Sequence, residues 1–497
     1  MSKRSASTGL GSLATGGVTA TALAVQTGLA ALVGVVIARE LGRTAETDGF
    51  FASYGVFIVL GLAATAMRVT VLPPLARARD ERRLSVETVA YAGALAAVAL
   101  PVAIVGVLAA EPLAALLTGF GPEQAREATA STLPWLLVAA VGHFAAGLLA
   151  SSLAALDDYL TPAVGYVIGS VVGLVLILLR IDENGVVAVA WGMALNAGIA
   201  MVVLALALAS RARTERMPGT AVRPRRSGTG RRLRELLAGA ALPFALQAVY
   251  LVCLPIAARG AVGDVTSLGY AYLVGAGVVA VAASSLGLVT SVPLTRAGID
   301  GRRVAAHVDA SSWIALLAIG ATAGIFAVGG GTILRSVLGS AYGTEIGEEI
   351  GLLVVLLAPW MVVSVGVSVT FPVVFVARRG ASLPLVALAV LVLHVPLAFA
   401  GQAIAGLWGL AAALAVSTAV ALGWMLYLLD AFRAALAELA FAAATVGGMV
   451  VAAYALPALL LDGVPAAVAG TVAFALVVAL LRPPGLRSSW AYLRELA

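Results

Sequence analysis

The segment RELGRTAETDGFF carries five charged side chains within ten residues, directly after the uncharged stretch 9–38. The five are Arg39, Glu40, Arg43, Glu46 and Asp48. Guanidinium groups and carboxylates at this density can form ion pairs that break and re-form, and a carboxylate can also take part in catalysis. The plainest role is structural: Thr47 or Asp48 would cap a following helix, with Phe50 and Phe51 anchoring its start at an interface.

Three further polar side chains stand inside apolar stretches: Arg68 in LAATAMRVTV, Asn196 and Gln247. A guanidinium group in such a place is a candidate for binding phosphate, and an amide can donate and accept hydrogen bonds. We take these three as candidate substrate-binding residues. The structural alternatives are an Arg68 side chain that extends toward lipid headgroups and amides that hydrogen-bond between helices.

The other reactive residue types are few. His143 and His394 are single histidines in apolar stretches, where hydrogen-bonded packing is the expected role. Cys253 is the only cysteine and is expected to pack as a small apolar residue. We therefore predict no catalytic residue, no metal site and no cofactor.

The composition places these residues in a bilayer. The chain is 61% hydrophobic and 11% charged, with a mean hydropathy of +1.04, whereas soluble domains carry roughly 25% charged residues. A hydrocarbon core about 30 Å thick requires roughly 20 apolar residues per helix. Segments of this kind centre on 15–38, 51–73, 89–110, 132–155, 161–179, 186–209, 236–258, 266–292, 312–333, 351–376, 383–400, 404–428, 436–460 and 464–481. We expect an all-α membrane protein with about 14 transmembrane helices.

The basic residues give the orientation. Alternate connections between the predicted spans hold 24 of the 31 arginines and lysines, and the opposite connections hold 6. Because cytoplasmic loops carry the excess of basic residues, both termini are predicted to be cytoplasmic and the charged segment 39–48 to face outward. The expected location is the bacterial plasma membrane. The carboxylates fall outside the deep parts of the predicted spans.

Weak internal repeats divide the chain. Residues 37–78 match 256–297, Pro134-Trp135 matches Pro359-Trp360, and Trp191-Gly192 matches Trp408-Gly409. An even number of helices per repeat makes the repeats parallel. We predict an N-lobe (1–210), an Arg-rich cytoplasmic linker (211–235), a C-lobe (236–430) and two additional helices with a tail (431–497). The two parallel six-helix lobes suit alternating access.

With six, six and two helices and the string ARELGRTAETDGFFASY, the chain resembles the MurJ (MviN) lipid II flippases of the multidrug/oligosaccharidyl-lipid/polysaccharide exporter superfamily. The resemblance covers 37–51 well, the prolines near 74 fairly and ALDDYLTPA (155–163) loosely. It implies a flippase that moves an undecaprenyl-diphosphate-linked sugar, either lipid II or a surface-polysaccharide unit, to the outer leaflet. The first helix and segment 269–277 lack the arginines that the family uses to hold the diphosphate, so Arg68 is the expected substitute.

A second expectation concerns the outward-facing charges. Arg39, Arg43, Glu46 and Asp48 are predicted to form an outer gate with Arg259, whose pairs break as the lobes open. The alternative is catalytic, since membrane glycosyltransferases with polyprenyl donors place an acidic residue in this loop. The outer connections here are short for such an enzyme, so we expect a transporter.

The multidrug or cation antiporters of the same superfamily are the other alternative, although they have twelve helices and usually a membrane-embedded carboxylate. The expected partners are the lipid-linked oligosaccharide and membrane lipids, with no nucleic acid. The chain is expected to act as a monomer, in the vicinity of cell-wall synthesis proteins.

Overall fold

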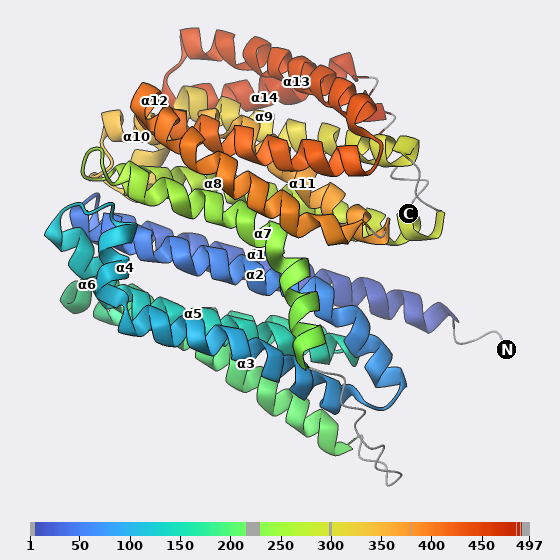
Figure 1. Cartoon of the computed structure of the whole chain (residues 1–497). Helices are drawn as coiled ribbons and strands as arrows, with labels where there is room; N and C mark the ends of the chain where they lie inside the picture. Colours follow the sequence, from blue (N-terminus) through green and yellow to red (C-terminus); the bar gives the residue numbers. More distant parts are fainter. Residues whose placement is uncertain are drawn as a thin grey trace. The chain divides into compact units, whose positions relative to one another are not determined.

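The protein is represented by a computed structural model that describes residues 5–214, 229–297, 301–377, 379–483, 485–487 and 489. All regular elements in these ranges are helices (Figure 1). The chain forms two compact units, Met1–Gln247 and Ala248–Ala497, which we call lobe one and lobe two. The boundary between them falls inside one helix. Residues 215–228 of the predicted linker lie outside the described residues.

Lobe one is built from six helices and the first part of a seventh. Their bounds are α1 (Ser5–Leu41), α2 (Ala45–Asp80), α3 (Leu84–Leu108), a short α4 (Ala110–Leu117), α5 (Glu123–Ala155), α6 (Leu160–Thr214) and α7 (Thr229–Ala257). Helix α5 packs against α2, α3 and α6. Apolar side chains of α2, α3 and α5 form a core that also includes Leu236 of α7.

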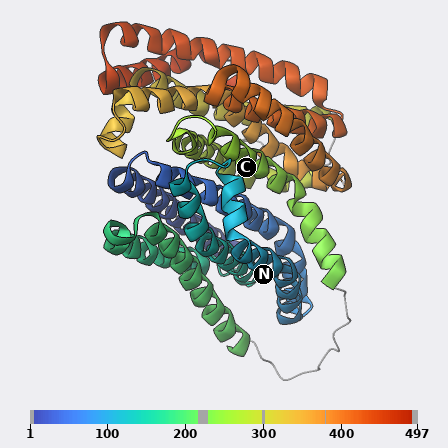
Figure 2. The ribbon, with the colours of Figure 1, turned by 60° about the vertical axis from the view of Figure 1, so that its left-hand side comes forward.

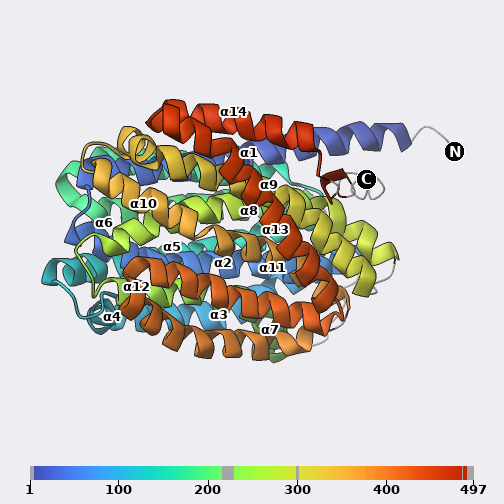
Figure 3. The same ribbon diagram turned by 90° about the horizontal axis from the view of Figure 1, so that it is seen from above.

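Lobe two continues from α7. Its helices are α8 (Asp264–Ala297), α9 (Gly301–Leu338), α10 (Thr344–Leu356), α11 (Ala358–Val376), a 3-10 turn at Gly380–Ser382, α12 (Leu383–Leu428), α13 (Phe432–Leu460) and α14 (Gly463–Leu481). Helices α13 and α14 pack on each other and on α9 (Figures 2 and 3). The Tyr454 hydroxyl of α13 donates a hydrogen bond to the carbonyl of Ala321 in α9 at 3.2 Å.

Helices α6 and α12 each consist of two helical arms joined at a glycine, and we call each of them a hairpin. Gly185 interrupts α6 with φ 52° and ψ −134°, and Gly406 interrupts α12 with φ 59° and ψ −136°. Glycine lacks the Cβ that makes such angles unfavourable, so it can reverse the chain here. In α6 the two arms fold back on each other, because Gly169 and Gly173 lie against residues 196 and 192.

The number of spans follows from these hairpins. Among the described residues, ten helices are long and apolar enough to cross a membrane, or eleven if the bent pair α10–α11 is one span. Counting α6 and α12 as two spans each, and including the 36-residue α2, gives the predicted fourteen in the described part of the chain. The number of spans therefore agrees with the number expected from hydropathy.

The backbone repeats between the lobes. Helix α5 covers 123–155, and α10 with α11 covers 344–376, so the two ends of this element recur at the same shift in residue number. The reversal at Gly406 follows the one at Gly185 by that same shift. The predicted match of Trp191 with Trp408 is displaced from this register by about one helical turn.

Candidate functional site

The charged segment 39–48 is almost entirely helical. Helix α1 extends to Leu41 and α2 begins at Ala45, so only 42–44 form a turn. Thr44 is the N-cap: its hydroxyl accepts from the Thr47 N–H at 3.3 Å, and the Thr47 hydroxyl accepts from the Thr44 N–H at 2.8 Å. The prediction that Thr47 or Asp48 is the N-cap is wrong, because the N-cap is Thr44; Thr47 takes part in the capping as the other half of the reciprocal pair.

Phe50 and Phe51 lie inside lobe one. Each is 1% exposed, which contradicts their predicted role as interface anchors. Phe50 stacks on Tyr54 with ring centroids 5.6 Å apart, and Tyr54 stacks on Phe57 at 5.7 Å. The spacing of these three rings along α2 places them on one helix face, where they pack within the lobe.

Glu46 contacts a distant part of lobe one. Its Oε1 accepts a hydrogen bond from the Val186 N–H at 3.1 Å, at the start of the second arm of α6. A Cβ at Gly185 would collide with the same oxygen. A carboxylate is favourable at a helix N-terminus, where backbone N–H groups lack partners. Glu46 thus joins the start of α2 to the turn of the α6 hairpin.

The remaining gate candidates are placed as follows. Asp48 is buried, Arg43 is partly buried and Arg39 is exposed, all in lobe one. Arg259 is exposed in lobe two, with its guanidinium carbon 5.3 Å from the ring centroid of Phe399. The outer gate among these residues stays a prediction.

The substrate-binding candidates lie on three helices. Arg68 belongs to α2, but its side chain lies outside the described residues. Gln247 is partly buried and is the last residue of lobe one. Asn196 lies in the second arm of α6, and its Oδ1 is buried without a hydrogen-bond partner among the described residues. Their role in substrate binding stays a prediction.

Lobe two has a polar cluster in the corresponding part of its hairpin. When Gly406 is aligned with Gly185, Ser417 and His394 of α12 take the places of Asn196 and Gly173 of α6. His394 is fully buried, with Nδ1 2.9 Å from the Ser417 hydroxyl and Nε2 3.4 Å from the Cys253 sulfur. The prediction that His394 is a hydrogen-bonded packing residue is confirmed. Both lobes thus have polar side chains in this part of the hairpin: an amide in lobe one, and an imidazole with a hydroxyl in lobe two.

His143 has a different environment, in lobe one. Its ring meets that of Phe57 edge to face at a centroid distance of 5.6 Å and stacks on that of Tyr166 at 6.3 Å. The contacts to these two rings agree with the predicted packing role.

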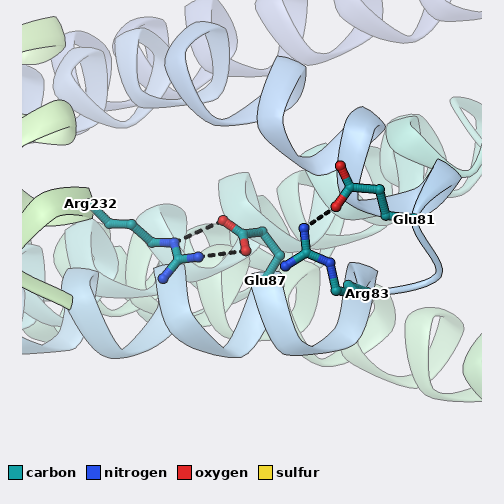
Figure 4. A network of polar contacts seen from close by, with 4 residues as sticks. All are labelled: Glu81, Arg83, Glu87 and Arg232. Atoms are coloured by element: carbon teal, nitrogen blue, oxygen red, sulfur yellow. Dashed lines mark hydrogen bonds and ion pairs between the residues drawn. The ribbon is translucent and has the colours of Figure 1, made fainter. Parts of the chain in front are cut away.

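Sequence reasoning missed a buried ion pair at the start of α7. The Arg232 Nε and one terminal nitrogen donate to the two Glu87 carboxylate oxygens at 2.8 and 2.5 Å (Figure 4). Arg232 belongs to an Arg-rich segment that composition alone marks as solvated. The signal that could have found it is Glu87, an acidic residue at the start of an apolar helix.

Sequence reasoning also placed the start of α9 too late. The helix begins at Gly301, so its apolar part includes His307 and Asp309. The Asp309 Oδ1 is buried without a hydrogen-bond partner among the described residues. A carboxylate is thus present near one end of a span, although not at its centre.

Comparison with known proteins shows the fold. A scan of protein-family models and a search of curated protein sequences found no match. Among solved structures, the lipid II flippase MurJ in an inward closed conformation matches with a TM-score of 0.70 and 13% identity, covering 93% of this chain and 98% of that one. An inward-facing multidrug resistance MATE family transporter of the MOP superfamily matches with a TM-score of 0.58 and 15% identity, covering 85% and 98%. A MOP superfamily transporter from Pyrococcus furiosus matches with a TM-score of 0.53 and 17% identity, covering 84% and 94%.

These structural neighbours are a flippase and transporters that share the helical fold over 84 to 93% of this chain at 13 to 17% identity. The chain therefore has the membrane-transporter fold that is shared by MurJ and the MATE proteins of the MOP superfamily.

Proposed function

We propose that the chain is a flippase that moves an undecaprenyl-diphosphate-linked sugar, lipid II or a surface-polysaccharide unit, from the inner to the outer leaflet by alternating access. The observation that carries the proposal is the extent of the likeness to MurJ, which covers 93% of this chain, against 85% for the MATE transporter. The additional coverage is comparable to the length of α13 and α14, the two helices beyond a twelve-helix antiporter.

The physical need for such a protein is clear. A charged diphosphate and its sugar are too polar to enter hydrocarbon, whereas the polyprenyl tail is soluble in it. A polar path for the headgroup is therefore required. Arg68 is our candidate for the phosphate contact, because guanidinium binds phosphate through two parallel hydrogen bonds.

Ligand-induced stabilisation tests the cargo. At about 100 times its Kd, a ligand that binds only the folded state stabilises it by roughly 2.7 kcal/mol. We expect a polyprenyl-diphosphate-sugar to raise the unfolding temperature of the purified protein and a polyprenyl monophosphate-sugar to raise it less. Arg68→Ala should remove most of this shift while the ligand-free protein unfolds as before. A shift with a cationic drug alone would instead support the antiporter alternative.

One observation favours that alternative as the second candidate. The buried Asp309 oxygen lies in an apolar helix, and a membrane carboxylate is the usual proton or cation carrier of antiporters. Proton-coupled efflux of a cationic dye from vesicles, lost in Asp309→Asn, would identify an antiporter.

We further propose that both termini are cytoplasmic in a bacterial plasma membrane. A cysteine introduced as Gly219→Cys in a Cys253→Ala background should react only with membrane-permeant reagents in intact cells. Labelling by an impermeant reagent would contradict this orientation.

A further inference from the structure

Residues 215–228 separate α6 from α7, and both helix ends beside this segment are held by ion pairs on lobe one. At the α6 end, Arg211 donates to Asp158 at 3.0 Å. The Asp158 carboxylate also accepts from the Thr161 N–H and hydroxyl at 3.1 and 2.9 Å, at the start of α6. The last turns of α6 are therefore tied to the α5–α6 connection.

The α7 end is held more deeply. The side chains of Arg232 and Glu87 are 8% and 13% exposed, so their two hydrogen bonds are largely shielded from water. The guanidinium carbon of Arg232 also lies 5.4 Å from the ring centroid of Tyr91, one turn further along α3. Figure 4 shows Arg232 extending from α7 toward the carboxylate of Glu87.

Apolar packing continues the attachment along α7. Leu236, one turn after Arg232, is 7% exposed and packs in the core cluster of Met67, Val71, Leu75 and Tyr91. The first turns of α7 therefore share both a buried ion pair and a hydrophobic core with α2 and α3. This agrees with the end of lobe one at Gln247, inside α7.

We propose that residues 229–236 are a strap fixed to lobe one by the Glu87–Arg232 pair, so that the described helix ends on both sides of segment 215–228 are held by lobe one. If a segment connects two lobes that move relative to each other, a change in its length alters how its ends are held. If both ends are fixed on one lobe, a change in its length leaves them as they were. Breaking the buried pair should release the strap, because a single charge left without its partner in a shielded site is strongly unfavourable.

The test is hydrogen exchange of the full chain in lipid nanodiscs, read on peptides that cover 230–236. Glu87→Gln should reduce protection there by at least about a hundredfold, without changing the protection of peptides of α13 and α14. Inserting a Gly-Ser segment after Gly219 should leave protection unchanged. Asp157→Asn, which breaks the exposed Arg79–Asp157 pair, is the matched control and should also have no effect. Unchanged protection in Glu87→Gln, or a loss on insertion equal to that of Glu87→Gln, would overturn the proposal.

A second measurement covers the case in which Glu87→Gln does not fold. In a chain that keeps Glu87 and Arg232 and carries a protease site after Gly219 and Cys253→Ala, the pair Tyr91→Cys and Leu236→Cys, from the core cluster shared by α3 and α7, should be joined by a short bismaleimide in membranes. After cleavage, the two fragments should then migrate together on a denaturing gel. If the fragments migrate separately while the same reagent joins a control cysteine pair inside lobe one, the placement of the strap is contradicted. Neither measurement depends on the cargo.

Discussion

The reversals in α6 and α12 have nearly the same backbone but different surroundings. At Gly185, a Cβ would meet the Glu46 carboxylate, which also binds the next N–H. At Gly406, among the described residues, a Cβ would meet nothing within 4 Å, and Val265 is the residue that matches Glu46 in the repeat of 37–78 by 256–297. The repeat thus keeps the path of the chain, while lobe one alone adds a side chain that fixes the turn.

The opposite ends of the two hairpins show a second difference. In lobe one, Asp158 of the α5–α6 connection pairs with Arg211 near the end of α6. In lobe two, Arg379 takes the place of Asp158 when the two hairpin glycines are aligned, and it pairs at 3.2 Å with Asp430, close to the position that matches Arg211. An ion pair thus recurs near this end of both hairpins, with the acidic and basic residues exchanged.

Alanine substitutions of the two hairpin glycines should have the largest effects on the free energy of unfolding. Gly406→Ala should destabilise the protein by about 1 to 3 kcal/mol, the cost of placing a Cβ in this backbone region. Gly185→Ala should cost about 1 to 3 kcal/mol more, because Glu46 must move away and leave the Val186 N–H unpaired. Denaturant unfolding in detergent measures both. Equal losses would show that Glu46 does not fix the turn.

Substitutions of Glu46 test directly whether its carboxylate stabilises the turn at Gly185. Glu46→Ala should cost about 1.5 to 3 kcal/mol, the range for a hydrogen bond to a charged group, whereas Glu46→Gln retains an acceptor and should cost less. Both values come from unfolding without substrate. A variant that unfolds like the wild type but transports poorly would favour the gate role for Glu46 over the structural one.

The exchanged ion pairs should give the smallest effects. Asp158 is buried and also binds Thr161, so Asp158→Asn should cost about 1 to 3 kcal/mol. Arg379 and Asp430 have side chains 46% and 77% exposed, so Asp430→Asn should cost about 0 to 1 kcal/mol. Thermal unfolding of the two variants side by side measures the difference. If Asp430→Asn lowered the stability more than Asp158→Asn, the exposure of the side chains would not determine how much each ion pair contributes.

The sequence predicted what depends on local composition. Hydropathy gave the number of spans, and the distribution of arginine predicted an orientation that cysteine labelling tests. The start of α2 was missed because a capping pair, Thr44 with Thr47, extends the helix into a charged segment. The contacts of Glu46 and Arg232 were missed for another reason: their partners, Val186 and Glu87, are far away in the sequence, and only the folded lobe brings them together.

Transport in proteoliposomes tests the central claim most directly. The purified chain is reconstituted with a fluorescent undecaprenyl-diphosphate-sugar, and the fraction of headgroups that an impermeant quencher reaches is followed with time. We predict that the protein transfers headgroups between leaflets well above the rate in empty vesicles and faster than it transfers a monophosphate-linked sugar. Transfer at the rate of empty vesicles, by protein that moves a cationic dye in the same preparation, would contradict the flippase assignment.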